Sequence, residues 1–258
     1  MNDLIPVSRE RHGERKWTRF KDFSFASRMT RVPITGRELV EAAMAMPLAF
    51  TETSGRYSLV AMLSVVPDKN MLVGPAGQWL GAHIPLVLRG YPFRMRRQGD
   101  NLALCVDEAG LQPVGSFEGE RFFDKDGNPS PETKAMNDYL APIEANLLAT
   151  DQAVSLLARA GVLKPWGLTV NTETAVDQKV EGLHIVSEAA LNALDDDAFL
   201  KLRKGSALPI AYAQLFSMKA LVIFEHLAKL QTPQPAPGLP DSVSKMLSRG
   251  SDDTIRFN

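Results

Sequence analysis

Residues 48–62 read LAFTETSGRYSLVAM, and this stretch decides the fold class. Two runs rich in apolar, aromatic and β-branched residues flank Ser54-Gly55, a pair typical of a turn. Short runs of the same kind continue to residue 107. The breaks between them fall at Pro67-Asp68, Gly74-Pro75, Gly90 and Gly99-Asp100. This punctuation predicts a largely antiparallel sheet in the N-terminal half of the chain.

Helical patterns lie on both sides of this stretch. Thr35, with Glu38 three residues later, forms a capping box that predicts a short helix ending before Pro47. Apolar residues recur every three or four positions from 130 to 160, which predicts a long amphipathic helix ending at Gly161. Three further helices are predicted at 187–194, 196–204 and 208–230. The fold class is therefore α+β, with a β-rich N-terminal half packed by C-terminal helices.

The chain divides into three predicted parts. Residues 1–32 are basic and aromatic and predict an N-terminal arm laid across a folded body. We favour packing of its aromatic residues within the protein, and a clamp for phosphate or an acidic partner is the alternative. Residues 33–230 form a single predicted α+β domain. Residues 231–258 begin with a Pro-rich stretch and are predicted to be a flexible tail.

Composition describes an ordinary globular protein and excludes some partners. The 258 residues include 45% apolar residues and carry a net charge of -1. Residues 1–100 contain 15 basic and 9 acidic side chains, whereas residues 101–200 contain 6 and 17. Because the chain as a whole has no strong basic excess, we expect no nucleic-acid partner.

Two segments bear on localisation. Charged residues from Arg9 to Lys16 follow the first residues closely, so we expect no secretory signal and a cytoplasmic protein. The apolar stretch 206–218 is interrupted by Lys219, and a further apolar run ends at Glu225. We therefore expect a buried or amphipathic helix here and no membrane span.

Local motifs of catalysis and metal binding are missing from the sequence. Cys105 is the only cysteine, and the four histidines have no metal-ligand spacing, so we expect no metal site. A buried structural thiol is the favoured role for Cys105, with a Cys–His nucleophile as the alternative. The sequence also contains no nucleophile elbow, Walker loop or dinucleotide-binding glycine pattern, and we expect no cofactor.

Several separated segments match one family. Residues 79–93 read WLGAHIPLVLRGYPF, and residues 119–127 read GERFFDKDG. Further matches to this family, in the family's order along the chain, are residues 104–108, Gly182-Leu183 and Tyr212-Ala213. Together they resemble the SapC-like family of bacterial proteins over roughly residues 5–230. The chain departs from the family pattern at Gly90, where a second arginine is common, and at Gln214, where histidine is common.

The best-matched segment supplies the candidate ligand-binding residues. Trp79 and Tyr91 offer aromatic surface, and Arg89 offers a planar fork suited to a carboxylate or phosphate. His83 is a further candidate because it lies in a segment suited to lining a pocket, and Asp107 completes the set. The alternative is that Arg89 forms an internal ion pair with an acidic residue such as Asp107 and that the aromatic residues fill the core.

The resemblance implies a role without naming a reaction. The family takes its name from genes beside surface-layer protein genes, and other members resemble neighbours of tryptophan-halogenase-like and TonB-dependent receptor genes. This implies a non-catalytic accessory or binding protein with a protein partner or a small acidic or sugar-like ligand. The alternative is an enzyme whose site is assembled from dispersed residues around His83 and Arg89. A purely structural surface-layer component is weakened by the expected lack of an export signal.

Overall fold

The hairpin expected from residues 48–62 forms the centre of the larger sheet. The computed structural model describes residues 4–99, 101–172 and 175–231. Strand β4 (Leu48–Thr53) pairs antiparallel with β5 (Arg56–Met62). Ser54 and Gly55 both have positive φ angles, 51° and 76°. A two-residue hairpin loop with a type I′ turn requires positive φ at both positions. Glycine at the second position allows this conformation without strain from a side chain.

Two antiparallel sheets contain most of the strands, and most of these strands come from the N-terminal half of the chain. The larger has the order β3-β5-β4-β12-β9, adding β3 (Arg31–Pro33), β12 (Leu183–Val186) and β9 (Leu163–Pro165). The smaller has the order β1-β7-β6, with β1 (Leu4–Pro6), β7 (Asn101–Asp107) and β6 (Phe93–Gln98). Two short pairs complete the strands: β2 (Lys16–Trp17) with β8 (Glu120–Arg121), and β10 (Leu168–Thr172) with β11 (Ala175–Val180).

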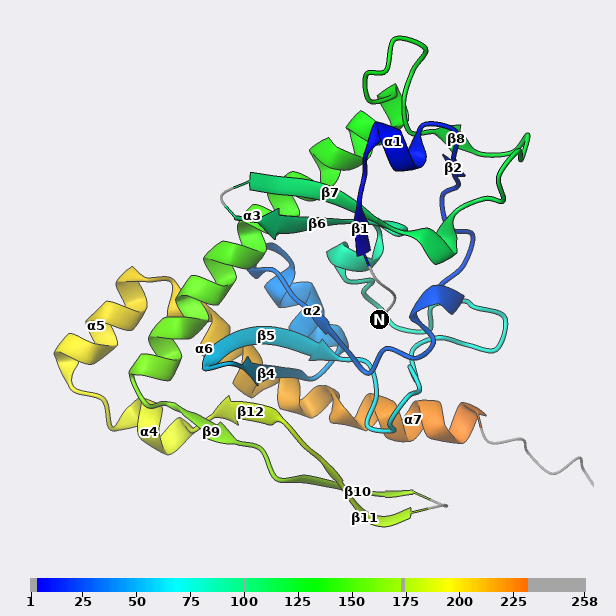
Figure 1. Ribbon diagram of the computed structural model, residues 1–258. Helices are drawn as coiled ribbons and strands as arrows, with labels where there is room; N and C mark the ends of the chain where they lie inside the picture. Colours follow the sequence, from blue (N-terminus) through cyan, green and yellow to red (C-terminus); the bar gives the residue numbers. More distant parts are fainter. Residues whose placement is uncertain (1–3, 100, 173–174, 232–258) are drawn as a thin grey trace, which may run out of the picture.

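One long helix joins the two sheets. Helix α3 (Pro131–Arg159) begins at Ser130, whose hydroxyl accepts a hydrogen bond from the Thr133 amide. It ends before Gly161, which has a φ of 70°. The helix contacts both β5 and β6 and crosses the molecule between the two sheets (Figure 1). Its buried face therefore forms the core that the two sheets share.

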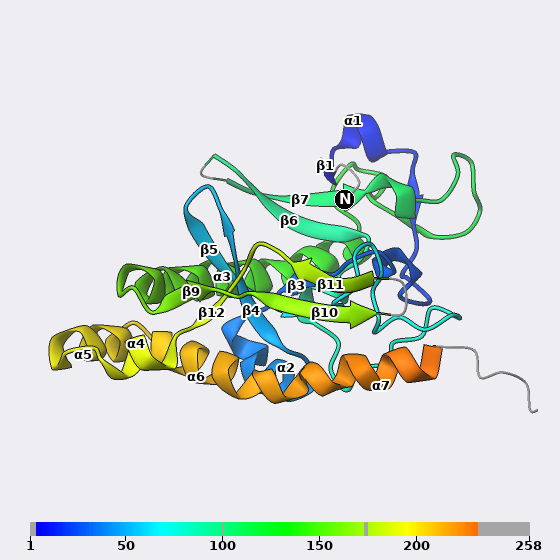
Figure 2. The same ribbon diagram turned by 90° about the horizontal axis from the view of Figure 1, so that it is seen from below.

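The remaining helices include α6 (Ala207–Ser217), which contacts β4 and β12 of the larger sheet. The others are α2 (Leu39–Ala45), α4 (Glu188–Asn192), α5 (Asp196–Lys204) and α7 (Val222–Gln231). Short 3-10 turns occupy Ser24–Ala26, Gly36–Glu38, Leu86–Leu88, Glu108–Gly110 and Met218–Leu221, and a short helix α1 occupies Arg9–His12. Helices α6 and α7 form an almost continuous rod, with α2 beside α6 (Figure 2). The molecule is therefore mixed α+β, with antiparallel sheets mostly N-terminal and helices C-terminal.

One helical stretch in the described residues passes a length-and-composition test for a membrane span. Residues Ala207–Lys229 are long and apolar enough, but core helices of soluble proteins pass the same test. Part of this stretch is core, since Leu208, Ile210 and Ala211 are buried. α6 also contacts α2, α3 and β12.

The basic aromatic N-terminal segment packs across the body. β1 pairs with β7, and Trp17 is fully buried with its ring 4.7 Å from that of Phe93. Farther along, Phe23 packs on Trp79, and Phe25 stacks on Tyr91. The aromatic residues thus anchor the segment within the protein, while its charged residues remain mostly at the surface. The Pro-rich stretch after Gln231, predicted to be a flexible tail, lies outside the described residues.

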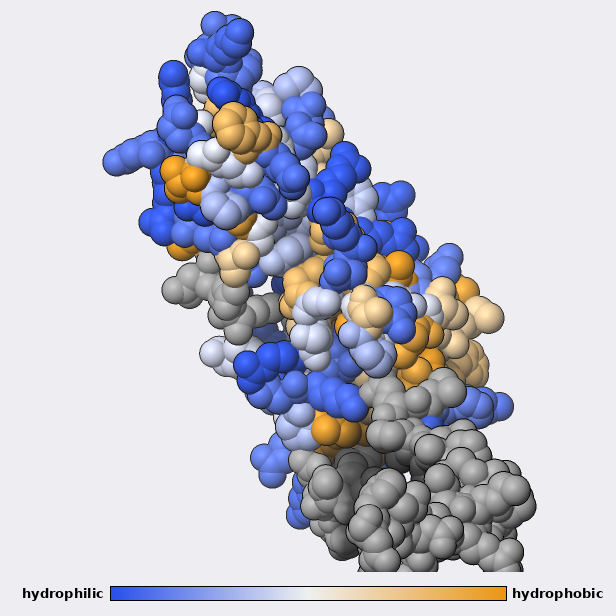
Figure 3. Space-filling model, turned by 90° about the vertical axis from the view of Figure 1, so that its right-hand side faces the viewer, coloured by the Kyte–Doolittle hydropathy of each residue, from blue (hydrophilic) through white to orange (hydrophobic). Residues whose placement is uncertain are grey.

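One face of the molecule carries both hydrophilic and hydrophobic residues (Figure 3). Seen from the right-hand side of Figure 1, hydrophilic residues predominate at its upper end, and hydrophobic residues gather around the middle of the face (Figure 3). A pocket opens between the N-terminal segment and the β6–β7 hairpin.

Candidate functional site

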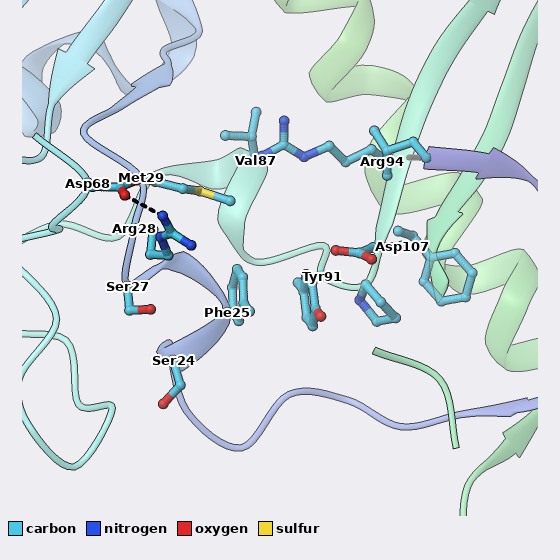
Figure 4. Close-up of a pocket in the computed structure, with 13 residues that line it drawn as sticks. Ser24, Phe25, Ser27, Arg28, Met29, Asp68, Val87, Tyr91, Arg94 and Asp107 are labelled. Carbon is cyan, nitrogen blue, oxygen red and sulfur yellow. Dashed lines mark hydrogen bonds and ion pairs between the residues drawn. The ribbon is translucent and has the colours of Figure 1, made fainter. Parts of the chain in front are cut away.

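The pocket has a volume of about 520 Å³, which is within the usual range for small-molecule sites. Its walls come from the N-terminal segment, the β6–β7 hairpin and the loop that follows β5. The lining residues are Leu4, Ser24, Phe25, Ser27, Arg28, Met29, Asp68, Val87, Tyr91, Pro92, Phe93, Arg94 and Asp107. Ten of them are labelled in Figure 4. Segments far apart in the sequence therefore build this pocket together.

A stacked aromatic pair forms one wall. The rings of Phe25 and Tyr91 are 3.9 Å apart and 6° from parallel (Figure 4). Glycine at position 110 leaves room for the Tyr91 ring, because a Cβ atom on residue 110 would lie 2.7 Å from the Tyr91 hydroxyl. Burial, and then the charge of Asp107, raises the pKa of Tyr91. The phenol therefore stays protonated and remains a hydrogen-bond donor.

Arg94 is one of the two arginines that line the pocket. It lies on β6, and its side chain runs along the top of the pocket toward Val87 (Figure 4). Burial lowers the pKa of Arg94, while the negative charges of Asp107 and Glu144 oppose this change. Within the described part of the chain, its guanidinium donates no hydrogen bond and forms no ion pair. A mostly buried cation in this state is a ready partner for an anionic ligand group.

Two carboxylates and a second arginine complete the polar lining. Asp107 ends β7, and its Oδ1 accepts a hydrogen bond from the Ala109 amide at 3.0 Å, which fixes its orientation. Arg28 and Asp68 form an exposed ion pair at the other side of the pocket (Figure 4). This ion pair lowers the pKa of Asp68. The pocket thus combines donors and acceptors beside an aromatic wall, which suits a small ligand with both anionic and hydroxyl groups.

The five sequence-predicted site residues separate into two groups. Tyr91 and Asp107 line the pocket, whereas Trp79, His83 and Arg89 do not. The Trp79 indole donates to the His83 carbonyl oxygen at 2.8 Å and so fixes its own loop. Both Nε and Nη2 of Arg89 donate to the Ile84 carbonyl oxygen, at 3.0 and 2.9 Å. Arg89 and Asp107 form no ion pair in the described part of the chain.

His83 joins a separate buried network around Glu38. Its Nε2 lies 2.9 Å from Glu38 Oε2, which also accepts a hydrogen bond from the Leu86 amide at 2.8 Å. The amide and hydroxyl of Thr35 both donate to Glu38 Oε1 at 3.1 Å. Glu38 is 3% exposed. This carboxyl group holds the start of α2 against the loop that carries His83.

Sequence reasoning missed the residues of the pocket that lie outside the best-matched segment. Arg94 precedes Met95, Arg96 and Arg97, and this basic run is typical of a solvent-exposed strand. Strand alternation gives no signal for the pocket, because it places Arg94 on the same face as the exposed Arg96 and opposite the buried Phe93. No pattern in the sequence connects Phe25 or Asp68 with Tyr91, because only the fold brings these residues together.

The two departures from the family pattern have structural roles. Gly90 is buried, and a Cβ atom there would lie 2.5 Å from Leu140 Cδ2 on α3. A larger side chain at this position therefore requires Leu140 to move. Gln214 is fully buried, accepts from the Val186 amide at 2.8 Å and donates to the Leu48 carbonyl oxygen at 3.3 Å. It connects α6 to strands β12 and β4.

Cys105 is a buried thiol on β7. It is fully buried, and its Sγ lies 3.7 Å from the Ala103 carbonyl oxygen. Burial raises the pKa of the Cys105 thiol, so the protonated form is favoured. Within residues 4–99, 101–172 and 175–231, no group of three or more His, Cys, Asp or Glu side chains is arranged to hold a metal ion.

These features define a class: an α+β protein with two antiparallel sheets and a small polar pocket closed by its own N-terminal segment. The chain belongs to the SapC family, whose family model, described as SapC, matches residues 7–222. The match begins after β1 and ends at the first residue of α7. It includes the pocket residues other than Leu4. Neither a search of curated proteins nor a search of solved structures found a match to the chain.

Proposed function

We propose that this SapC-family protein is a non-catalytic accessory protein that binds a small acidic or sugar-like ligand in the pocket between its N-terminal segment and the β6–β7 hairpin. The observation that carries the proposal is the state of Arg94. Its guanidinium is mostly buried, faces the pocket and has no hydrogen-bond or ion-pair partner in the described residues. Burying a charge in this state costs free energy, and an anionic ligand would offset that cost.

The other lining residues favour a ligand with a second kind of group. Phe25 and Tyr91 offer a flat surface of the kind that sugar rings and other planar ligands contact. Asp107 and the hydroxyls of Ser24 and Ser27 can bind ligand hydroxyls. A carboxylate or phosphate on such a ligand would pair with Arg94. Sugar phosphates and sugar acids are therefore the first classes to test.

The arrangement supports binding more than catalysis. In the enzyme alternative, His83 and Arg89 form one site, yet their polar atoms bind Glu38 and Ile84 respectively. His83 and Glu38 do make an oriented imidazole–carboxyl pair, which is part of many catalytic sites. In the described residues, no Ser, Thr or Cys nucleophile hydrogen-bonds to that imidazole. A binding role therefore accounts for more of the geometry.

The family resemblance supports a proposed physiological setting. SapC-like genes lie near surface-layer genes, and related genes lie near those for nutrient uptake. We propose that the protein acts in the cytoplasm on the ligand or protein partner of such a system. A sensor or carrier of a sugar acid or sugar phosphate fits both the resemblance and the pocket.

A ligand screen tests the proposal. Acidic metabolites and sugar phosphates would be screened by thermal shift on the wild type, on Arg94→Met and on Arg96→Met. Arg96 is exposed on the same strand and does not line the pocket, so its variant is the matched control. We expect at least one compound to stabilise the wild type and Arg96→Met. Arg94→Met should bind it at least about tenfold more weakly, since a charge-assisted hydrogen bond is worth roughly 1.5–3 kcal/mol. Equal binding by all three proteins would refute the proposal.

A further inference from the structure

A second hollow lies among the helices and is apolar. It has a volume of about 610 Å³ and lies between α2 and the α6–α7 rod. Its lining residues are Leu39, Val40, Ala43, Met44, Ala45, Pro209, Tyr212, Ala213, Phe216, Lys219, Ala220, Val222 and Ile223. We call it the α2–α6 groove. Lys219 is the one charged residue in this lining.

The groove exposes large apolar side chains to solvent. Met44 is 82% exposed, Phe216 is 74% exposed and Val40 is 67% exposed. Tyr212 and Phe216 lie one turn apart on α6 with their rings stacked 6.4 Å apart. Single exposed apolar residues are common, but a group of them around one apolar hollow marks a surface that binds something. A short amphipathic helix is the usual occupant of such a groove.

The C-terminal part of the same chain contains a segment with the matching pattern. Residues 239–250 read LPDSVSKMLSRG. Val243, Met246 and Leu247 have the i, i+3, i+4 spacing that places three apolar side chains on one helix face. Asp241 or Ser242 is a suitable N-cap, and Gly250 is a suitable stop. The segment thus has the sequence features of a short amphipathic helix with one apolar side.

The chain is long enough to bring this segment back to the groove. Helix α7 ends at Gln231, 15 residues after Phe216, which corresponds to about 23 Å along a helix. Residues 232–240 contain four prolines, at 233, 235, 237 and 240. An extended Pro-rich stretch of this length spans about 28 Å. The Pro-rich stretch is therefore a sufficient linker between the end of α7 and the groove.

We propose that residues 241–249 dock in the α2–α6 groove of their own chain, with Val243, Met246 and Leu247 covering its apolar lining. The chain returns from the end of α7, so Asp241 enters the groove first. Lys219 lies toward the α7 end of the groove, where a carboxylate at the start of the segment would pair with it. The segment thereby covers a surface that would otherwise associate nonspecifically. This proposal is independent of the pocket, because the two sets of lining residues have no member in common.

Disulfide trapping in the full chain tests the docking. The native Cys105 is fully buried, so two introduced cysteines, Met44→Cys and Met246→Cys, would be the accessible thiols of the described surface and the segment. Met44 is mostly exposed, and its substitution should leave the fold intact, as circular dichroism would confirm. Under mild oxidation at low protein concentration we expect an intrachain disulfide in most molecules. The control pair Lys125→Cys with Met246→Cys, whose first position is exposed and far in sequence from the groove, should form at least tenfold less.

Three outcomes are decisive. Adding Val243→Asp and Leu247→Asp should reduce the Met44→Cys with Met246→Cys disulfide at least tenfold, because it charges the docking face. A disulfide whose yield rises with protein concentration and links two chains would show that the groove binds a second copy, which would overturn the proposal. Equal cross-linking of the test and control pairs would also overturn it, because it would show random collision of the segment with the surface.

Discussion

Two neighbouring regions of the molecule carry similar side chains in opposite states. In the loop of residues 79–89, the polar groups of Trp79, His83 and Arg89 are bound by other parts of the protein. In the hairpin of residues 91–107, Arg94 faces a pocket and has no such partner among the described residues. The first region stabilises the fold, and the second is the region that we propose binds a ligand. Residue type alone does not separate these roles, whereas the hydrogen-bond partners of each group do.

The largest effect should come from removing the carboxyl group that organises the loop. Glu38→Ala leaves the Thr35 and Leu86 amides and the His83 imidazole without their common partner in a buried place. We expect a loss of about 3 kcal/mol in the unfolding free energy, since each unsatisfied buried group costs roughly 1–3 kcal/mol. In a chain of this size that is a fall in Tm of about 6 to 12 °C. Urea unfolding and calorimetry would measure both.

Glu41→Ala is the matched control for that change. Glu41 is exposed on α2, in the same part of the chain, and its loss should alter stability by less than about 0.5 kcal/mol. Ligand binding in the pocket should survive Glu38→Ala at a temperature where the variant is folded. If both variants were equally stable, the loop of residues 79–89 would not depend on this network and the comparison would fail.

A smaller effect is expected at Arg89. Its guanidinium is exposed and hydrogen-bonds the Ile84 carbonyl oxygen through two nitrogens. Arg89→Met keeps the apolar stem and removes these bonds, so we expect a loss of about 1 kcal/mol and no change in ligand affinity. A loss of 3 to 5 kcal/mol would instead indicate a broken buried ion pair. Chemical denaturation beside the thermal-shift screen would distinguish these results.

The fold was more predictable than the pocket, for physical reasons. Hairpins and helices depend on local signals: Ser54-Gly55 for the β4–β5 turn, Thr35 with Glu38 for the start of α2, and the apolar spacing for α3. These predictions required only neighbouring residues. The class of fold followed because sheets and amphipathic helices must bury their apolar faces against each other.

The pocket depends on contacts that no local pattern encodes. Of the predicted ligand-binding residues, Tyr91 and Asp107 line the pocket, whereas Arg89 does not and Arg94, which was not predicted, does. Which arginine is bound internally depends on where the Ile84 carbonyl oxygen lies. Phe25 stacks on Tyr91 across 66 positions of sequence, and only the packed N-terminal segment creates that contact.

The smallest expected effect concerns the N-terminal segment that closes the pocket. His12 is fully buried, with its ring 5.1 Å from that of Phe122 and its Nε2 3.3 Å from Glu108 Oε1. Burial lowers the pKa of His12, and the charge of Glu108 only partly opposes this. Below about pH 6.5 the unfolded chain therefore binds a proton that the folded chain resists, so this group's contribution to stability falls as the pH falls.

Two measurements check the His12 prediction. Proton NMR should show that the imidazole of His12 titrates below 6.5, and urea unfolding should show a smaller decrease in stability from pH 7.5 to 5.5 for His12→Gln than for the wild type. A titration of His12 above 6.5 would mean that Glu108 outweighs burial. In that case the segment would be held more firmly at low pH.

The most direct test of the difference between the two regions is an NMR titration that observes the Nε–Hε groups of Arg94 and Arg89 in one sample. The best compound of the thermal-shift screen would be added stepwise to the wild-type protein. We expect the Arg94 signal to shift with the ligand and its hydrogen exchange to slow, while the Arg89 signal stays where it is. A shift confined to Arg89, or a screen in which no acidic metabolite or sugar phosphate stabilises the protein, would contradict the assignment of Arg94 as the ligand-binding cation.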